Sequence, residues 1–100
     1  METRTPHYDL AIVQAGVARL GAAAFTKTAL DGGRAMGLTT AEMLAVVAAL
    51  TRRNFYKSMT TYADTRVWQD VYHAMTPVRK EAYIKITWRD LAPVIQFKEK

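Results

Sequence analysis

The hydrophobic period changes near Leu50, and this change constrains the fold more than any other feature of the chain. Before it, apolar residues recur at the spacing of one helix face. After it, they alternate with polar residues as along a strand. Helical segments followed by strands predict an α+β domain, with N-terminal helices packed on one face of a C-terminal antiparallel sheet. The chain has 100 residues and no internal repeat or linker, so we expect one domain over residues 1–100.

The first part of the chain predicts two helices, each with a stop signal. Residues 10–20 place apolar side chains on one helix face, with Asp9 positioned to cap the start and Gly21 to end the segment. A second helix is expected over residues 28–36, and Gly37 stands just after its end. We interpret both apolar faces as core packing.

A third helix has the clearest start signal. Thr39 and Glu42 have the spacing of a capping box, in which each side chain bonds the backbone N–H of the other residue. The apolar face that follows is also interpreted as core, and it consists of Met43, Val46, Val47 and Leu50.

Strands are expected after residue 50. The candidates are residues 55–62, 68–73 and 82–88, and a last strand that starts at Leu91. Arg89-Asp90 predicts a tight turn between the last two. Pro93 cannot donate to a neighbouring strand, which is typical of a sheet edge or an early strand position.

The last two predicted strands have one apolar and one polar face. Alternation assigns to the core side Ala82, Ile84, Ile86, Trp88, Leu91, Pro93, Ile95 and Phe97. It assigns to the opposite face Tyr83, Lys85, Thr87, Gln96 and Lys98. If that second face is open to solvent, it forms a polar, basic and partly aromatic platform.

The positive charge lies entirely in the second half. The net charge is +5, yet residues 1–50 hold equal numbers of basic and acidic side chains. Residues 51–100 hold ten Lys and Arg against five acids, together with eight of the ten aromatic residues. Basic and aromatic residues together suggest a polyanionic partner, nucleic acid first. A basic surface over core aromatics explains the same composition equally well.

The residue types that are missing exclude several classes of site. The chain has no cysteine and two histidines, which excludes cysteine-based zinc sites, iron–sulfur clusters and thiol nucleophiles. We therefore expect neither a metal nor a cofactor. A chain without cysteine suits the reducing cytoplasm. Gln14 and Arg19 interrupt an apolar run that is too short to cross a bilayer, so we expect no membrane association.

Four segments of the second half resemble one known family. They are Phe55-Tyr56-Lys57-Ser58-Met59-Thr60-Thr61-Tyr62, Trp68-Gln69-Asp70-Val71-Tyr72, Tyr83-Ile84-Lys85-Ile86-Thr87 and Phe97-Lys98-Glu99-Lys100. In this order and spacing they are similar to the MqsR toxins (motility quorum-sensing regulators), the mRNA-cleaving halves of type II toxin–antitoxin pairs. The first half adds Arg4-Thr5-Pro6-His7, whereas its alanine-rich helices and Gly32-Gly33 depart from the family pattern.

The resemblance implies a fold, an activity and a partner. The fold is that of the RelE-type ribonucleases, and the activity is metal-independent endonucleolytic cleavage of mRNA at GCU-like sites. The partner is an inhibitory antitoxin, expected to bind zinc and to carry a helix-turn-helix DNA-binding domain. The residues that match the family's active site are Lys57, Gln69, Tyr83 and Lys98. We add Lys85 and Gln96, from the predicted polar face, as RNA-binding candidates.

These residue types suit RNA cleavage by the ribose 2′-OH. That reaction needs a base, an acid at the leaving 5′-oxygen and positive charge on the phosphorane. Lysines supply charge, a lysine crowded by cations can act as a base, and tyrosine and glutamine can hold or orient a phosphate. Which group is base and which is acid stays open at this point.

Alternation supports only part of this set. Tyr83 and Lys98 fall on the predicted polar face. Lys57 is in phase with Phe55 and Met59, so a regular strand would aim it at the core unless a bulge or a strand end intervenes. The assignment of Gln69 depends on the resemblance alone.

Two other functions fit the composition. A small RNA-binding module without chemistry needs only cations and stacking surfaces, and an interaction domain could use its basic face to meet an acidic protein. Ordinary structural roles are expected for other polar residues. His73 is interpreted as a loop or strand-end residue, and Asp64 and Asp70 as capping groups or partners of Arg66.

Overall fold

The computed structural model describes residues 1–100, and it has the predicted α+β architecture. The helices are α1 (Leu10–Leu20), α2 (Lys27–Met36) and α3 (Thr40–Ala48), with short 3₁₀ turns η1 (Gly21–Ala24) and η2 (Arg52–Asn54). The strands are β1 (Glu2–Thr3), β2 (Phe55–Thr60), β3 (Trp68–Met75), β4 (Glu81–Arg89) and β5 (Ala92–Glu99). None of the helices has the length and apolar character needed to span a bilayer.

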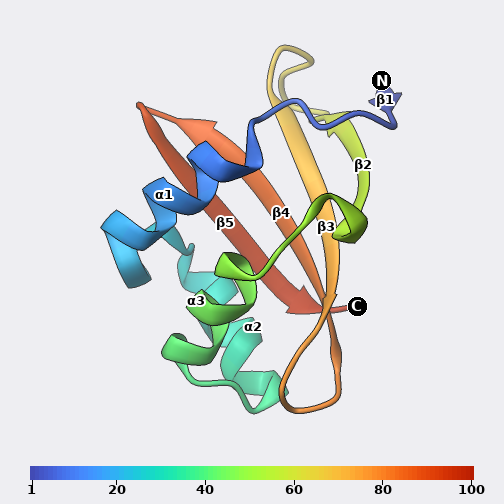
Figure 1. Cartoon of the computed structure of the whole chain (residues 1–100). Coiled ribbons are helices and arrows are strands. Elements are labelled where there is room, and N and C mark those ends of the chain that lie inside the picture. The colour runs from blue at the N-terminus through green and yellow to red at the C-terminus, as the bar shows by residue number, and fades with distance from the viewer.

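The five strands form one antiparallel sheet in the order β1-β2-β3-β4-β5. The helices pack on one side of it, mainly over β4 and β5 (Figure 1), and the start of α2 lies at the β5 edge, while most of the other side is uncovered. We call these sides the helix-facing side and the open face. Ile84, Ile86, Ile95 and Phe97 join the helices in one buried core, as the alternation predicted.

The helices α1 and α3 begin at the predicted caps. The Asp9 carboxylate accepts hydrogen bonds from the backbone N–H groups of residues 11 and 12. Thr39 and Glu42 form the complete capping box. α2 starts one residue earlier than predicted because Thr26 caps it, and it ends at Gly37 in the left-handed conformation, with φ of 92°.

Several predicted strand ends needed correction. β4 runs over Glu81–Arg89 rather than residues 82–88, so Arg89 ends this strand instead of forming the predicted turn with Asp90. β2 stops at Thr60 rather than residue 62, and β3 continues to Met75 rather than residue 73. Leu91 was assigned wrongly to the apolar face of the last strand. It forms the turn with Asp90, both residues have positive φ, and the Leu91 side chain is 87% exposed. A two-residue turn with positive φ at both residues matches the right-handed twist of the flanking strands. β5 therefore begins only at Ala92.

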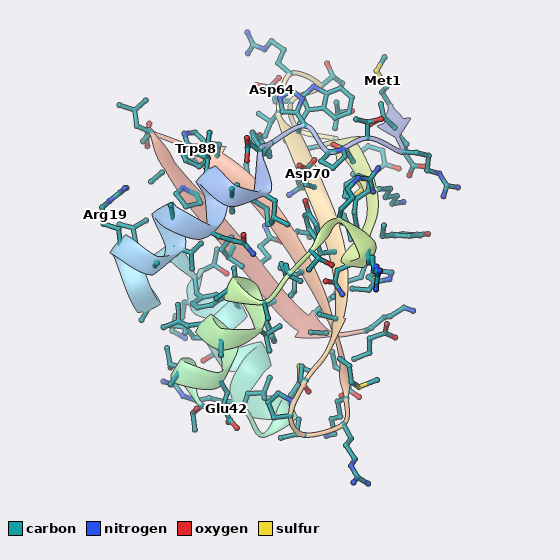
Figure 2. All side chains as sticks on the ribbon, viewed as in Figure 1. Met1, Arg19, Glu42, Asp64, Asp70 and Trp88 are labelled. Atoms are coloured by element: carbon teal, nitrogen blue, oxygen red, sulfur yellow. The ribbon has the colours of Figure 1, made fainter.

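Asp70 has a role that the sequence did not indicate. Its side chain is buried on the helix-facing side and makes no ion pair, unlike Asp64, which pairs with Arg66 (Figure 2). The two Asp70 carboxylate oxygens accept hydrogen bonds from the backbone N–H groups of His7, at 3.0 Å, and Tyr8, at 2.8 Å. This contact fixes the segment that leads from β1 to α1 across the sheet.

Both tryptophans lie on the helix-facing side. Trp68 alternates in phase with Asp70, and its ring stacks on His7 with 5.2 Å between centroids. Trp88 pairs with Pro93 across β4 and β5 and lies beside α1 (Figure 2). The core-side assignment of Trp88 is therefore confirmed.

The two adjacent glycines of α2 allow close packing on both sides of the helix. A Cβ atom at Gly32 would overlap the backbone carbonyl oxygen of Phe97 in β5, and one at Gly33 would overlap the Met43 side chain in α3. Glycine weakens a helix, yet here it lets the α2 backbone approach the sheet edge. Since Lys98 follows Phe97 directly, this contact also positions β5 where a predicted site residue stands.

We predict that Gly32→Ala destabilises the protein although alanine favours helix formation. Propensity alone would stabilise the folded state by about 1 kcal/mol. The overlap with a backbone oxygen, which cannot rotate away, should instead cost about 1–3 kcal/mol net. Urea unfolding measures the change in the free energy of unfolding. Ala35→Gly, at an exposed position of α2, is the control that measures the effect of helix propensity alone in the same helix. A Gly32→Ala protein more stable than wild type would contradict the close-packing role.

Candidate functional site

All six predicted site residues lie on the open face. Because residues paired across antiparallel strands share a face, the registers define its rows. One row is His73, Tyr83 and Lys98, and the next is Lys57, Val71, Lys85 and Gln96. Gln69 pairs with Met59 in a third row, which Thr87 and Val94 continue. The structure thus brings residues from four strands, separated by up to 41 positions, onto one surface.

A β-bulge in β2 places Lys57 there. Phe55 pairs with Tyr72 and Lys57 with Val71, so Tyr56 is an extra residue without a partner in β3. Phe55 consequently faces the helices, while Lys57 and Met59 both face the open side. The bulge explains how Lys57 can face the open side although regular alternation would put it on the same side as Phe55. The expectation that Met59 shares the side of Phe55 was wrong.

Lys57 is held by an ion pair with Glu2 of β1. The distance between Lys57 Nζ and the Glu2 carboxylate is 2.6 Å, and 23% of the lysine side chain is exposed. This hydrogen bond raises the pKa of Lys57 and lowers the pKa of Glu2. A lysine acting as a base needs the opposite shift, so the geometry favours Lys57 as a fixed positive charge.

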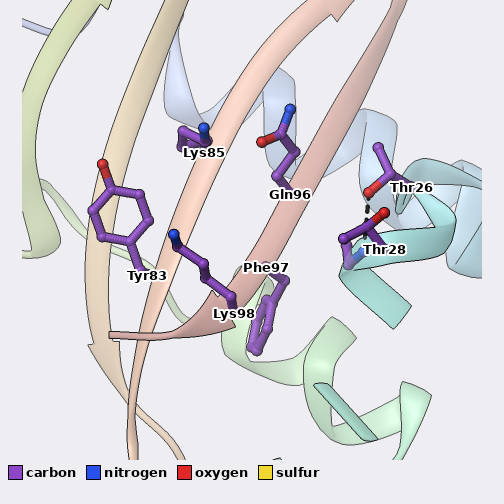
Figure 3. A pocket seen from close by; sticks show the side chains of 8 residues that line it. Thr26, Thr28, Tyr83, Lys85, Gln96, Phe97 and Lys98 are labelled. Atoms are coloured by element: carbon purple, nitrogen blue, oxygen red, sulfur yellow. Dashed lines mark hydrogen bonds between the residues drawn. The ribbon is translucent and has the colours of Figure 1, made fainter. Parts of the chain in front are cut away.

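The other lysines of the open face are unpaired. Neither Lys85 nor Lys98 forms an ion pair. The Lys98 Nζ atom lies 5.4 Å from the centre of the Tyr83 ring, and the two side chains project from neighbouring strands (Figure 3). The Tyr83 hydroxyl has no hydrogen-bond partner within the chain. The ammonium groups of Lys85 and Lys98 and the Tyr83 hydroxyl are therefore free to bind a ligand.

Two buried residues show that the open face is well packed without a helix over it. Val71 is 0% exposed, although its cross-strand neighbours in that row are Lys57 and Lys85. Thr87, predicted for this polar face, is buried as well. The aliphatic parts of long lysine side chains cover apolar surface while their charges stay in water.

His73 lies on this surface between Tyr56 and Tyr83, and sequence reasoning missed it. It is not a strand-end residue, because β3 continues beyond it. Its ring stacks on Tyr56 with 4.5 Å between centroids and lies 5.3 Å from the Tyr83 ring. The His73 Nε2 atom is buried without a hydrogen-bond partner. Only the register, which sets His73 opposite Tyr83, could have shown this position.

A cavity of about 390 Å³ adjoins the row of His73, Tyr83 and Lys98 at the β5 edge (Figure 3). Its lining includes four of the predicted residues, Tyr83, Lys85, Gln96 and Lys98. The start of α2 completes the wall with Thr26, Thr28 and Ala29, which no sequence signal had connected to the sheet. No three His, Asp or Glu side chains come together as a metal site.

Comparison with known proteins decides the family. Residues 5–99 match the family described as "Motility quorum-sensing regulator, toxin of MqsA". The chain belongs to the MqsR toxin family. It is also 41% identical over 100 residues to the mRNA interferase toxin MqsR of Escherichia coli strain K12, and this match covers the whole of both chains. The family assignment from four second-half segments is thus confirmed, and the first half belongs to the same match.

We predict that His73 makes stability dependent on pH. Burial, and next the positive charge of Lys100, lower the pKa of His73. As the pH falls through about 6.5, the unfolded chain therefore binds a proton before the folded protein does, and stability decreases. His73→Phe keeps a ring between the two tyrosines but cannot titrate. The wild-type thermal midpoint should fall further than that of His73→Phe between about pH 7.5 and 5, whereas parallel profiles would refute the assignment.

Proposed function

We propose that this protein is an mRNA interferase, a metal-independent and sequence-selective endoribonuclease of a type II toxin–antitoxin system. The observation that carries the proposal is the gathering of Lys57, Gln69, Tyr83 and Lys98 on one open face. A relative that is 41% identical over its full length is named an mRNA interferase toxin. Cleavage at GCU-like sites, a RelE-type fold and action in the cytoplasm are parts of the same proposal.

The cations on this face suit the transition state of RNA cleavage. Attack of a ribose 2′-OH on the adjacent phosphate builds negative charge on the phosphorane oxygens. Lys57, like any lysine of ordinary pKa, is protonated at neutral pH, and the hydrogen bond with Glu2 raises its pKa further. Lys98 and Lys85 carry charges without an internal counterion. In the proposed mechanism these ammonium groups bind the phosphate and supply the positive charge.

Tyr83 and Gln69 have the orienting and proton-transfer roles in this mechanism. The Tyr83 hydroxyl, free of internal partners and next to Lys98, can exchange a proton or a hydrogen bond with the reacting phosphate. Gln69 offers an amide donor and acceptor from the third row of the open face. The raised pKa of Lys57 argues against this lysine as the base.

We further propose that a protein antitoxin controls this activity. The matching family is described as the toxin of MqsA, which names the kind of partner. A nuclease that cleaves mRNA needs such an inhibitor to spare its own cell. A zinc-binding antitoxin with a helix-turn-helix domain is the form that we expect.

We predict that Tyr83→Phe lowers single-turnover RNA cleavage by about ten- to a thousandfold, the size of one acid–base or oxyanion contact. The ring is kept and no buried partner is lost, so the thermal midpoint should stay close to wild type. RNA affinity should fall far less, since the lysines remain. Tyr62→Phe is the matched control, because Tyr62 is fully exposed outside the site.

The same variant separates the alternatives. Unchanged cleavage in Tyr83→Phe would remove this residue from the mechanism. Wild-type protein that binds RNA without cutting it would instead establish the non-catalytic RNA-binding module. A collapsed thermal midpoint would show that the hydroxyl is structural.

We also predict that cleavage continues in EDTA and leaves 2′,3′-cyclic phosphate and 5′-hydroxyl ends. These ends follow from a 2′-OH nucleophile, because the 2′-oxygen stays bound to phosphorus when the 5′-oxygen leaves. End-group analysis of a cleaved oligonucleotide measures this directly. Activity that stops in EDTA and returns with magnesium would contradict the mechanism.

A further inference from the structure

The cavity beside Lys98 is larger than the chemistry of one phosphate requires. Its volume of about 390 Å³ falls in the range of ligand pockets. One wall is the open face of β4 and β5, and the other is the start of α2 (Figure 3). Tyr83 and Lys98 belong to the proposed reaction centre, so whatever fills this cavity lies next to the reacting phosphate.

Polar groups without internal partners line this cavity. The Thr28 hydroxyl and the Gln96 amide make no hydrogen bond within the chain. Thr26 Oγ1 accepts a hydrogen bond from the Ala29 N–H at 3.0 Å, which leaves the hydroxyl hydrogen of Thr26 free to donate. These neutral donors and acceptors face the cavity from two elements that are separate in the sequence.

The chemistry of the lining changes from one side to the other. Lys85 and Lys98 provide positive charge on the side of the reaction centre. Towards α2 the lining is uncharged, with the hydroxyl groups of Thr26 and Thr28 and the amide of Gln96. The two lysines favour phosphate, whereas the hydroxyl groups and the amide can hydrogen-bond either to a phosphate or to the edge of a base. A flat base with polar edges, joined to a phosphate, matches both parts.

We propose that this cavity binds the base of a nucleotide adjoining the scissile phosphate of single-stranded RNA. Gln96 and Thr28 hydrogen-bond to the base edge, while Lys85 and Lys98 contact the attached phosphates. Base edges differ in their pattern of donors and acceptors, so these two residues contribute to sequence preference. This inference rests on the proposed function, whose sequence selectivity it assigns to particular side chains.

The test measures preference rather than activity alone. Single-turnover cleavage and binding affinity are measured for RNA oligonucleotides that differ by one base at each position near the cleaved bond. Thr28→Val keeps the shape and removes the hydroxyl, and Gln96→Leu removes the amide. Each variant should change the ratio of preferred to non-preferred base by about three- to tenfold at one position only. Thr40→Val, in the first turn of α3 and outside the cavity, should keep the wild-type profile.

The outcomes separate this proposal from the function on which it rests. Cleavage with an unchanged preference in both Thr28→Val and Gln96→Leu would overturn the base pocket and leave the nuclease intact. RNA bound without cleavage, with a base preference that either variant weakens, would refute the nuclease and support the pocket. A wild-type protein with no base preference in cleavage or binding would overturn the pocket. Thermal midpoints show that each variant is folded.

Discussion

The alternation of side chains along β2 is interrupted once, and the composition of the open face depends on that interruption. A strand presents successive residues to opposite faces, so one inserted residue exchanges the faces of everything beyond it. Tyr56 is that inserted residue. It lets Phe55 contact Tyr72 in the core, with ring centroids 5.5 Å apart, while Lys57 joins the row of Lys85 on the other side.

The N-terminal segment links the helix-facing side of the sheet to the open face. Asp70 accepts the N–H groups of His7 and Tyr8 on the helix-facing side. The segment held in this way leads back to β1, whose Glu2 pairs with Lys57 on the open face. A buried carboxylate has a strong requirement for hydrogen bonds, so this anchor is well defined. The segment that carries Glu2, the partner of Lys57, is thus anchored by a contact made on the opposite side of the sheet.

The sequence predicted those parts of the site that follow from local rules. Strict alternation in β4 and β5 placed Tyr83, Lys85, Gln96 and Lys98 on one face. Capping residues located the starts of α1 and α3 and the end of α2. The rest needs contacts between distant segments. The bulge at Tyr56, the place of His73 opposite Tyr83 and the approach of Thr28 to β5 depend on strand register and helix packing. Leu91 was assigned wrongly because this apolar turn residue, which has positive φ, happens to continue the alternating pattern of β5.

The placement of both tryptophans separates the intrinsic optical signals of this protein. Trp68 and Trp88 lie on the helix-facing side, among the N-terminal segment and α1. Tyr56 and Tyr83 lie on the open face around His73. Indole emission therefore reports on the packing of the helix layer rather than on direct contact with a ligand at the open face. A label attached beside Tyr56 or Tyr83 would follow RNA binding at the surface where it is expected.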